Sequence, residues 1–260
     1  MEKEDTQIDD HHPAPIHQHW LSRNRLLAAN AAFTVYATAL AVDTGHADRT
    51  WAIWAAVGYG VTTLIIWLTR HKNVPLIWPM LVSLAGALAA PVTWLVTRVA
   101  PTPEVRVISR SAMLLLQHGS PYLPQGQLDT WLSYNPYLPV MAVFGLPKAL
   151  GATGLFGDPR VWLTATSIAL IGAAFAVAAP HRHCYSCRYN VMLSTVFFAA
   201  SPVIAFPLAV GITDPPVIAL ICFALACVAR YRVTWSARLP VLAGLAIGVA
   251  CAMKIGRAHI

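Results

Sequence analysis

Long apolar runs separated by shorter polar segments make up most of the chain. A helix that crosses a bilayer needs about 20 mostly apolar residues, with a range of about 17–25. Five runs are long enough and two shorter ones follow, so the pattern predicts an all-α, polytopic membrane protein with about seven transmembrane helices. The predicted spans are Leu26–Val42, Trp51–Leu68, Val74–Val96, Val161–Ala179, Val191–Ile212, Pro215–Ala229 and Leu239–Met253.

The third predicted span contains Pro79 and Pro91 in its interior. Proline removes a backbone N–H and leaves a carbonyl without its usual partner. Membrane helices tolerate this because side chains of neighbouring helices can donate to the freed carbonyl. We therefore expect residues 74–96 to remain one span.

Composition supports a membrane protein over a soluble one. Apolar residues make up 57% of the chain and charged residues 11%, against roughly 25% charged in an average soluble domain. These values exclude a disordered chain and an ordinary soluble enzyme. The net charge of +7 would point to nucleic acid in a soluble domain. Here the charges lie between apolar runs, so the expected partner is a lipid bilayer and not nucleic acid.

Loops at the two ends of the predicted spans differ in charge. One set is basic, and the other carries mostly acids and includes the long segment 100–160. Because cytoplasmic loops are enriched in Lys and Arg, we predict a cytoplasmic N-terminus and an outer segment 100–160. The basic set comprises Arg23, Arg25, Arg70, His71, Lys72, Arg182, Arg188, Arg230, Arg232 and Arg238, and the other contains Asp43, Asp48, Arg49 and Asp214.

Residues 1–25 precede the first span, and five of their first ten residues are Asp or Glu. A secretory signal peptide has a basic start, so this segment is not one. Its histidines, which offer a metal-binding alternative, are interrupted by Pro13 and Pro15. We predict a disordered cytoplasmic tail, followed by a transmembrane domain over 26–254.

The outer segment 100–160 is long enough to carry a functional site. Within it, Glu104–His118 has an apolar face of Val105, Ile108, Ala112 and Leu115. Arg106 and Arg110 share the other face at i and i+4. This spacing predicts an amphipathic helix on the outer membrane surface, ended by Gly119.

Two proline–aromatic elements follow the predicted helix, at 119–124 and 134–137. The next apolar run, Val140–Leu150, is short and contains Pro147 and Lys148. A tilted span here would reverse every later loop and break the charge pattern, so we favour an interfacial or re-entrant helix.

An acid near the membrane, an amphipathic helix, a Gly-Ser-Pro-Tyr turn and a Tyr-Asn-Pro-Tyr segment occur in this order. The order resembles the first outer loop of GT-C-type polytopic glycosyltransferases, in particular the actinobacterial, mannosyltransferase-like glycosyltransferase family 87. Glu104 stands where that family has Asp, and Asn135 replaces one of its prolines. The resemblance covers about residues 80–253, and its matched positions are Glu104, Gly119, Pro121, Tyr122, Tyr134, Pro136 and the outer turn Gly211–Pro215.

The resemblance implies a bacterial plasma-membrane enzyme that takes a sugar, mannose by the family's name, from a polyprenyl-phosphate donor. Its leaving group is already an anion, so one carboxylate acting as general base suffices and the anomeric centre is inverted. Glu104 is the first candidate base and Asp214 the second. Arg106 and Arg110 are candidates for binding the phosphate. Tyr122, Tyr134 and Tyr137 offer aromatic faces to the substrate, and no pattern supports a divalent metal or another cofactor.

Each of these residues also has a purely structural interpretation. Glu104 is equally placed to interact with the N-terminal end of its helix. Arg106 and Arg110 suit lipid headgroups, Asp214 suits a turn, and the tyrosines suit an interfacial belt. At the level of the whole chain, the alternative is a non-catalytic transporter or assembly partner. A transporter typically has charged residues or broken helices at mid-membrane, whereas every acid here lies at a span end or in a loop.

Two further segments complete the sequence predictions. His181, His183, Cys184 and Cys187 have zinc-ligand spacing, but no second ligand pair exists, so we expect no structural metal. Ile255–His259 resembles a reading frame of a common sequencing adapter. We therefore expect 255–260 to be a non-native tail on an N-terminal fragment.

Overall fold

A computed structural model describes residues 22–43, 46–128, 133–179 and 185–254. Over these residues the chain forms helices and no strand. Most of the predicted N-terminal tail, the whole of 255–260, and His181, His183 and Cys184 lie outside the described residues. The main helices are α1 (Arg23–Asp43), α2 (His46–Leu68), α3 (Ile77–Leu84), α4 (Ala90–Arg98), α5 (Pro103–His118), α8 (Pro159–Ala178), α9 (Tyr185–Ala200), α10 (Pro202–Val210), α11 (Asp214–Thr234) and α12 (Arg238–Met253).

Five helical segments are long and apolar enough to cross a membrane, as the apolar pattern predicts. They are α1, most of α2, the continuous run Ile77–Arg98, α8 and α11. The pair α9 and α10 raises the number to six if it counts as one span. The last helix, α12, is apolar but has only 16 residues. The all-α prediction is confirmed, and the candidate spans fit a multi-pass membrane protein, while the count of seven is not shown.

The predicted single span Val191–Ile212 is wrong in one respect, because α9 and α10 meet at an angle of 58°. Ser201 leaves the helical region with ψ 145°, and Pro202 then begins α10. Pro202 has no N–H to continue the ladder of α9. The hydroxyl of Tyr59 on α2 donates to the carbonyl of Ala200, at the end of α9. The Ala200 carbonyl therefore keeps a hydrogen-bond donor where the helix bends.

Pro79 and Pro91 are accommodated within the continuous run, as predicted. A π-helical turn at Ala85–Ala89 joins α3 to α4. Pro91 cannot donate to the carbonyl of Ala87, and the indole Nε1–H of Trp51 donates to it instead at 2.7 Å. The hydroxyl of Thr62 donates to the Pro79 carbonyl at 2.9 Å. Both donors belong to α2, which lies against this run.

Close approach of the two backbones makes these bonds possible. A Cβ on Gly86 would lie 2.5 Å from the Cα of Gly58 on α2, well inside van der Waals contact. Only glycine on both helices permits this distance.

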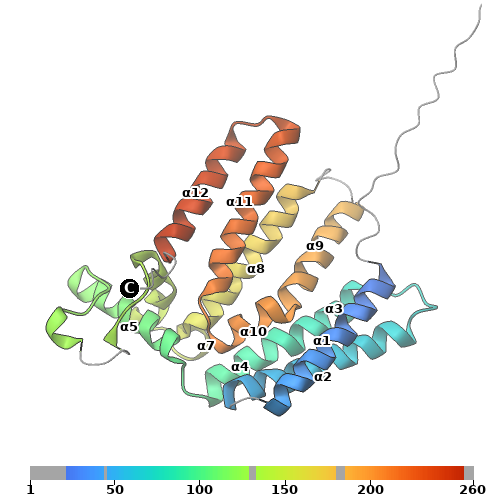
Figure 1. Cartoon of the computed structure of the whole chain (residues 1–260), viewed down its shortest axis with the longest axis horizontal. Coiled ribbons are helices and arrows are strands. Elements are labelled where there is room, and N and C mark those ends of the chain that lie inside the picture. Colours follow the sequence, from blue (N-terminus) through green and yellow to red (C-terminus); the bar gives the residue numbers. More distant parts are fainter. Residues whose placement is uncertain (1–21, 44–45, 129–132, 180–184, 255–260) are drawn as a thin grey trace, which may run out of the picture.

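The helices form two groups joined by the bent pair. Figure 1 shows α8, α11 and α12 side by side on one flank and α1, α2 and α3 together on the other. The pair α9–α10 lies between them, with α9 packed on both α3 and α8.

Contacts at the helix ends agree with the predicted alternation of loops. Arg23, at the start of α1, donates to the carbonyls of Thr69 (3.0 Å) and Val74 (2.9 Å) beyond the end of α2. At the other end, the amide of Leu138 in segment 100–160 donates to the carbonyl of Met253 at 3.1 Å. The basic end and the end bearing segment 100–160 are therefore opposite ends of the bundle.

The predicted amphipathic helix exists as α5, and Gly119 ends it with φ 71°. Val105, Ile108 and Ala112 are buried as expected. Their cover differs from the prediction, since the 3₁₀ helix Pro139–Gly145 (η5) packs on them and not the membrane surface. A Cβ on Gly145 would lie 2.6 Å from the Ile108 carbonyl oxygen, so this contact requires glycine.

The run Val140–Leu150 does not form a span. It folds as η5, of seven residues, and α6 (Leu146–Ala149), of four. These lengths are far below the roughly 20 residues that a span needs. The preference for a short, non-spanning helix is confirmed.

Replacing Trp51 by Phe tests the donation to the proline-freed carbonyl. Trp51→Phe removes the indole N–H but keeps an aromatic ring, and should lower stability by about 1 kcal/mol. Thermal unfolding in detergent measures the change. Trp54→Phe is the control, because Trp54 is 37% exposed and donates no hydrogen bond within the described residues. Equal losses of thermal stability in the two variants would contradict a stabilising hydrogen bond from Trp51 to Ala87.

Candidate functional site

A pocket of about 770 Å³ opens at the end of the bundle that carries the outer segment. Its walls come from four places in the chain: the start of α2, the start of α5, the loop before η5, and α10 with the turn after it. The residues that line it are Asp48, Thr102, Pro103, Glu104, Val107, Tyr134, Pro136, Tyr137, Phe206, Val210 and Ile212.

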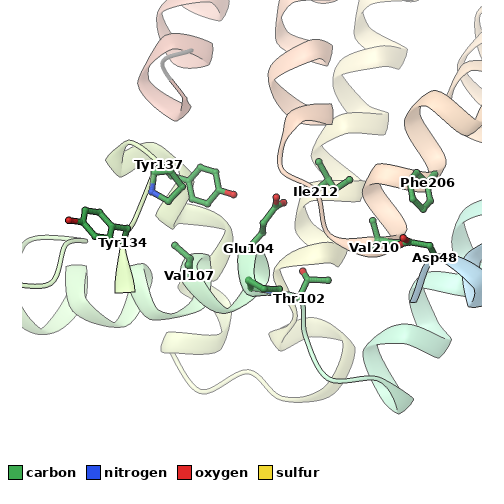
Figure 2. A pocket seen from close by; sticks show the side chains of 11 residues that line it. Asp48, Thr102, Glu104, Val107, Tyr134, Tyr137, Phe206, Val210 and Ile212 are labelled. Atoms are coloured by element: carbon green, nitrogen blue, oxygen red, sulfur yellow. The ribbon is translucent and has the colours of Figure 1, made fainter. Parts of the chain in front are cut away.

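Glu104 lies in the first turn of α5 and is partly buried. Thr102 and Pro103 begin the helix, and the fixed φ of proline suits its first turn. Figure 2 shows the Glu104 side chain reaching into the space between Tyr137 and Ile212. A carboxylate here also meets the positive end of the α5 dipole. The first candidate base therefore faces the pocket, and its structural interpretation remains compatible with this position.

The aromatic segment 134–137 is fastened to α5 by Asn135. Its amide nitrogen donates to Ser111 Oγ at 2.9 Å and to the Pro121 carbonyl at 3.3 Å. Its amide oxygen accepts from the backbone N–H of Tyr137 at 3.0 Å. Asn135 thus fixes the backbone of the segment that carries Tyr134 and Tyr137.

Tyr122 and the two arginines of α5 donate to backbone carbonyls near the pocket and do not line it. The hydroxyl of Tyr122 donates to the Tyr137 carbonyl at 3.1 Å. Arg110 donates to the Ser133 carbonyl at 2.9 Å, and exposed Arg106 donates to the Pro101 carbonyl at 3.0 Å. These contacts position the backbone on either side of Glu104.

Asp214, the second candidate base, begins α11 and is likewise absent from the pocket lining. Its carboxylate forms an ion pair with Lys254, at the end of α12. The Asp214 side chain is 50% exposed. The structure therefore separates the two acids proposed from the sequence.

Asp48 is a pocket residue that the sequence analysis treated only as a loop charge. It lies near the start of α2, and Figure 2 shows it beyond Val210, on the far side of the pocket from Tyr137. Its position in a short loop at the predicted outer end was the available signal. Nothing local in the sequence links it to Glu104, since the two are brought together by packing.

Arg160 is a second residue that the sequence analysis missed. Its side chain is 2% exposed and forms an ion pair with Asp158 at 2.8 Å. Its Nη2 also lies 3.4 Å from the Leu95 carbonyl, near the end of α4. A Cβ on Gly211 (φ 92°) would lie 2.5 Å from Val105 and 3.1 Å from Arg160. Arg160 therefore packs where α4, α5 and the turn before α11 meet, against the glycine that separates the lining residues Val210 and Ile212.

The described residues show no cluster of three or more His, Cys, Asp or Glu side chains arranged to hold a metal. Cys187 is partly buried, but the other three residues of the predicted cysteine–histidine cluster lie outside the described part of the chain. The expectation about that cluster stays a prediction.

Comparisons with known proteins add no relative. No protein-family model matches the chain. No curated protein matches it. No solved structure matches it. The site's geometry and the sequence resemblance are thus the basis for a functional proposal.

Asp158→Asn tests the buried ion pair. Asparagine keeps the helix-capping role of Asp158, which accepts from the Arg160 backbone N–H at 2.9 Å, but removes the charge. Leaving Arg160 buried without its anion should cost about 3 kcal/mol, which denaturant unfolding measures. The matched control, Asp214→Asn, breaks a half-exposed pair and should cost about 1 kcal/mol or less. Similar losses would show that burial of the pair contributes nothing.

Proposed function

We propose that this chain is a GT-C-type membrane glycosyltransferase. It moves a sugar, mannose by resemblance, from a polyprenyl-phosphate donor to an acceptor at the outer face of a bacterial plasma membrane. One observation carries the proposal: Glu104, the acid of the resembling motif, lines a large pocket at the end of the bundle that bears the outer segment. The positions of Tyr134 and Tyr137 in the same wall support it.

The pocket's place suits a lipid-linked donor. A polyprenyl chain stays in the hydrocarbon while its phosphate and sugar lie at the membrane surface. Phe206, Val210 and Ile212 give the pocket an apolar wall on the side of the spans, and Glu104 and Thr102 give it a polar one on the side of the outer segment. A donor whose prenyl chain stays in the hydrocarbon could bring its sugar to the mouth of the pocket on the apolar side, with its phosphate outside the pocket.

The chemistry needs one base. The Glu104 carboxylate takes the proton of an acceptor hydroxyl, whose oxygen attacks the anomeric carbon. The bond from that carbon to the phosphate oxygen breaks, and polyprenyl phosphate leaves as an anion that needs no proton. Attack from the opposite face inverts the anomeric centre. Glu104 then returns the proton to solvent.

Roles for the other candidates follow from their positions. Glu104 ranks before Asp214, because the Asp214 carboxylate pairs with Lys254 and does not line the pocket. Asp48 is the second acid of the site. Arg106, exposed two residues from Glu104, is placed to meet the donor phosphate outside the pocket. Arg110 and Tyr122 position the loop that carries the aromatic wall.

The transporter alternative has one supporting feature, the broken pair α9–α10. Transporters also place charged groups at mid-membrane. Among the described residues, Arg160 is the one buried charged side chain, and it lies at the very start of α8. This distribution favours a site at the membrane surface.

Cysteine labelling tests the proposed orientation. In a background without native cysteines, a membrane-impermeant thiol reagent added outside intact cells should modify a cysteine at Gln127 and not one at Asn73. Both positions are exposed, and they lie at opposite ends of the bundle. Arg and Lys enrichment beside Asn73 is the reason for the expectation. The reverse labelling would rule out outer-face chemistry.

Glu104→Gln tests the general base. The variant should fold and bind donor but lose about 10²–10⁴-fold in turnover, the usual contribution of a general base. Transfer of radiolabelled mannose from polyprenyl-phosphate mannose in proteoliposomes measures this loss. Glu104→Asp should keep part of the activity, because it retains the carboxylate.

Asp214→Asn is the control for that experiment and should keep most of the activity. Near-normal transfer by Glu104→Gln would remove Glu104 as the base. A large loss in Asp214→Asn alone would transfer the role to Asp214.

A further inference from the structure

The charge of the pocket is unexpected for a site that would hold a phosphorylated donor. Two carboxylates, those of Asp48 and Glu104, line it. Over the part of the chain that the structure describes, no Lys, Arg or His side chain lines it. The pocket is therefore electronegative.

The nearby cations are engaged elsewhere. Arg160 is held by Asp158 at 2.8 Å, and Lys254 pairs with Asp214. On α5, Arg106 and Arg110 donate to backbone carbonyls and are absent from the pocket lining. A phosphate inside the pocket would meet two like charges without a compensating cation from these four residues.

Hydrogen-bond acceptors and aromatic rings dominate the polar wall. Carboxylates accept hydrogen bonds from hydroxyl groups. The Thr102 hydroxyl oxygen is buried and bonds to no described residue, so it is a group that a ligand can satisfy. Tyr134 and Tyr137 also line the pocket, and Figure 2 shows the ring of Tyr137 pointing toward Glu104. Hydroxyl-rich, uncharged molecules with flat apolar faces fit such a surface.

We infer that this pocket binds an uncharged, polyhydroxylated ligand and excludes phosphorylated ones. On the proposed function, on which this identification rests, the ligand is the acceptor glycan, and the donor phosphate stays outside the pocket. Asp48 is then a specificity-determining residue, because its charge faces the ligand from the side opposite Tyr137. Glu104 keeps its role as the base.

Binding to the full chain in lipid nanodiscs tests the inference without turnover. Three probes are compared by saturation-transfer NMR: a neutral methyl dimannoside, the same disaccharide with a phosphate monoester, and its amino-sugar analogue. The neutral probe should bind about tenfold or more tightly than the phosphorylated one, the size of effect that two like charges produce near a protein surface. The amino sugar, whose ammonium group is attracted by the same two carboxylates, should bind at least as tightly as the neutral probe.

Variants assign the selectivity to the pocket. Asp48→Asn should reduce the preference for the neutral over the phosphorylated probe by about fivefold, the value of one charge pair at contact distance in water. The control, Asp214→Asn, removes an equal charge outside the pocket lining and should leave the preference unchanged. Thr102→Val should weaken the neutral probe without changing its charge selectivity.

The outcomes separate this inference from the proposed function. Equal or tighter binding of the phosphorylated probe, weaker binding of the amino sugar than of the neutral probe, or no binding of the neutral probe would overturn the inference even if the protein transfers mannose. Selective binding of the neutral probe with no sugar transfer would keep the inference and overturn the glycosyltransferase proposal.

Discussion

Backbone groups that lie in hydrocarbon must be hydrogen-bonded within the protein, and this constraint governs the bundle. The prolines and breaks of the neighbouring helices would leave carbonyls without partners. Helix α2 supplies two of the missing donors: Trp51 donates to the Ala87 carbonyl, which Pro91 leaves free, and Tyr59 donates to the Ala200 carbonyl at the break. Thr62 of the same helix donates to the Pro79 carbonyl as well. The contact of Gly58 with Gly86 brings the backbones close enough for this. Irregular helices thus become compatible with a membrane because one regular helix lies beside them.

The irregularity at α9–α10 has a consequence for the site. Because the chain turns by 58° at Ser201, α10 runs toward the start of α5, and Phe206 and Val210 become a pocket wall. In the turn after α10, Gly211 packs closely against the side chains of Val105 and Arg160. A charged residue is tolerated there because Asp158 neutralises it at the bundle's end. The buried Arg160–Asp158 ion pair therefore packs against the turn that carries the lining residues Val210 and Ile212.

Among the described residues, the charged side chains that line the pocket are acidic, and the nearby arginines lie outside its lining. The carboxylates of Asp48 and Glu104 line the pocket, while Arg106 and Arg110 of α5 donate to the carbonyls of Pro101 and Ser133. A site of this kind is suited to activating a hydroxyl and poorly suited to enclosing a phosphate. In the proposed reaction the two substrates would then meet at the mouth of the pocket, one from the protein side and one from the membrane.

Sequence alone determined the features that depend on neighbouring residues. Apolar run length predicted the spanning helices, i/i+4 spacing predicted α5, and Gly119 predicted its end. The place of Glu104 at the start of that helix followed from the same pattern. Tertiary structure decided what covers Ile108, where α9 bends, and that Asp48 lines the same pocket as Glu104. These outcomes depend on contacts between residues far apart in the chain, such as Gly145 with Ile108 and Tyr59 with Ala200, and no local spacing encodes such contacts.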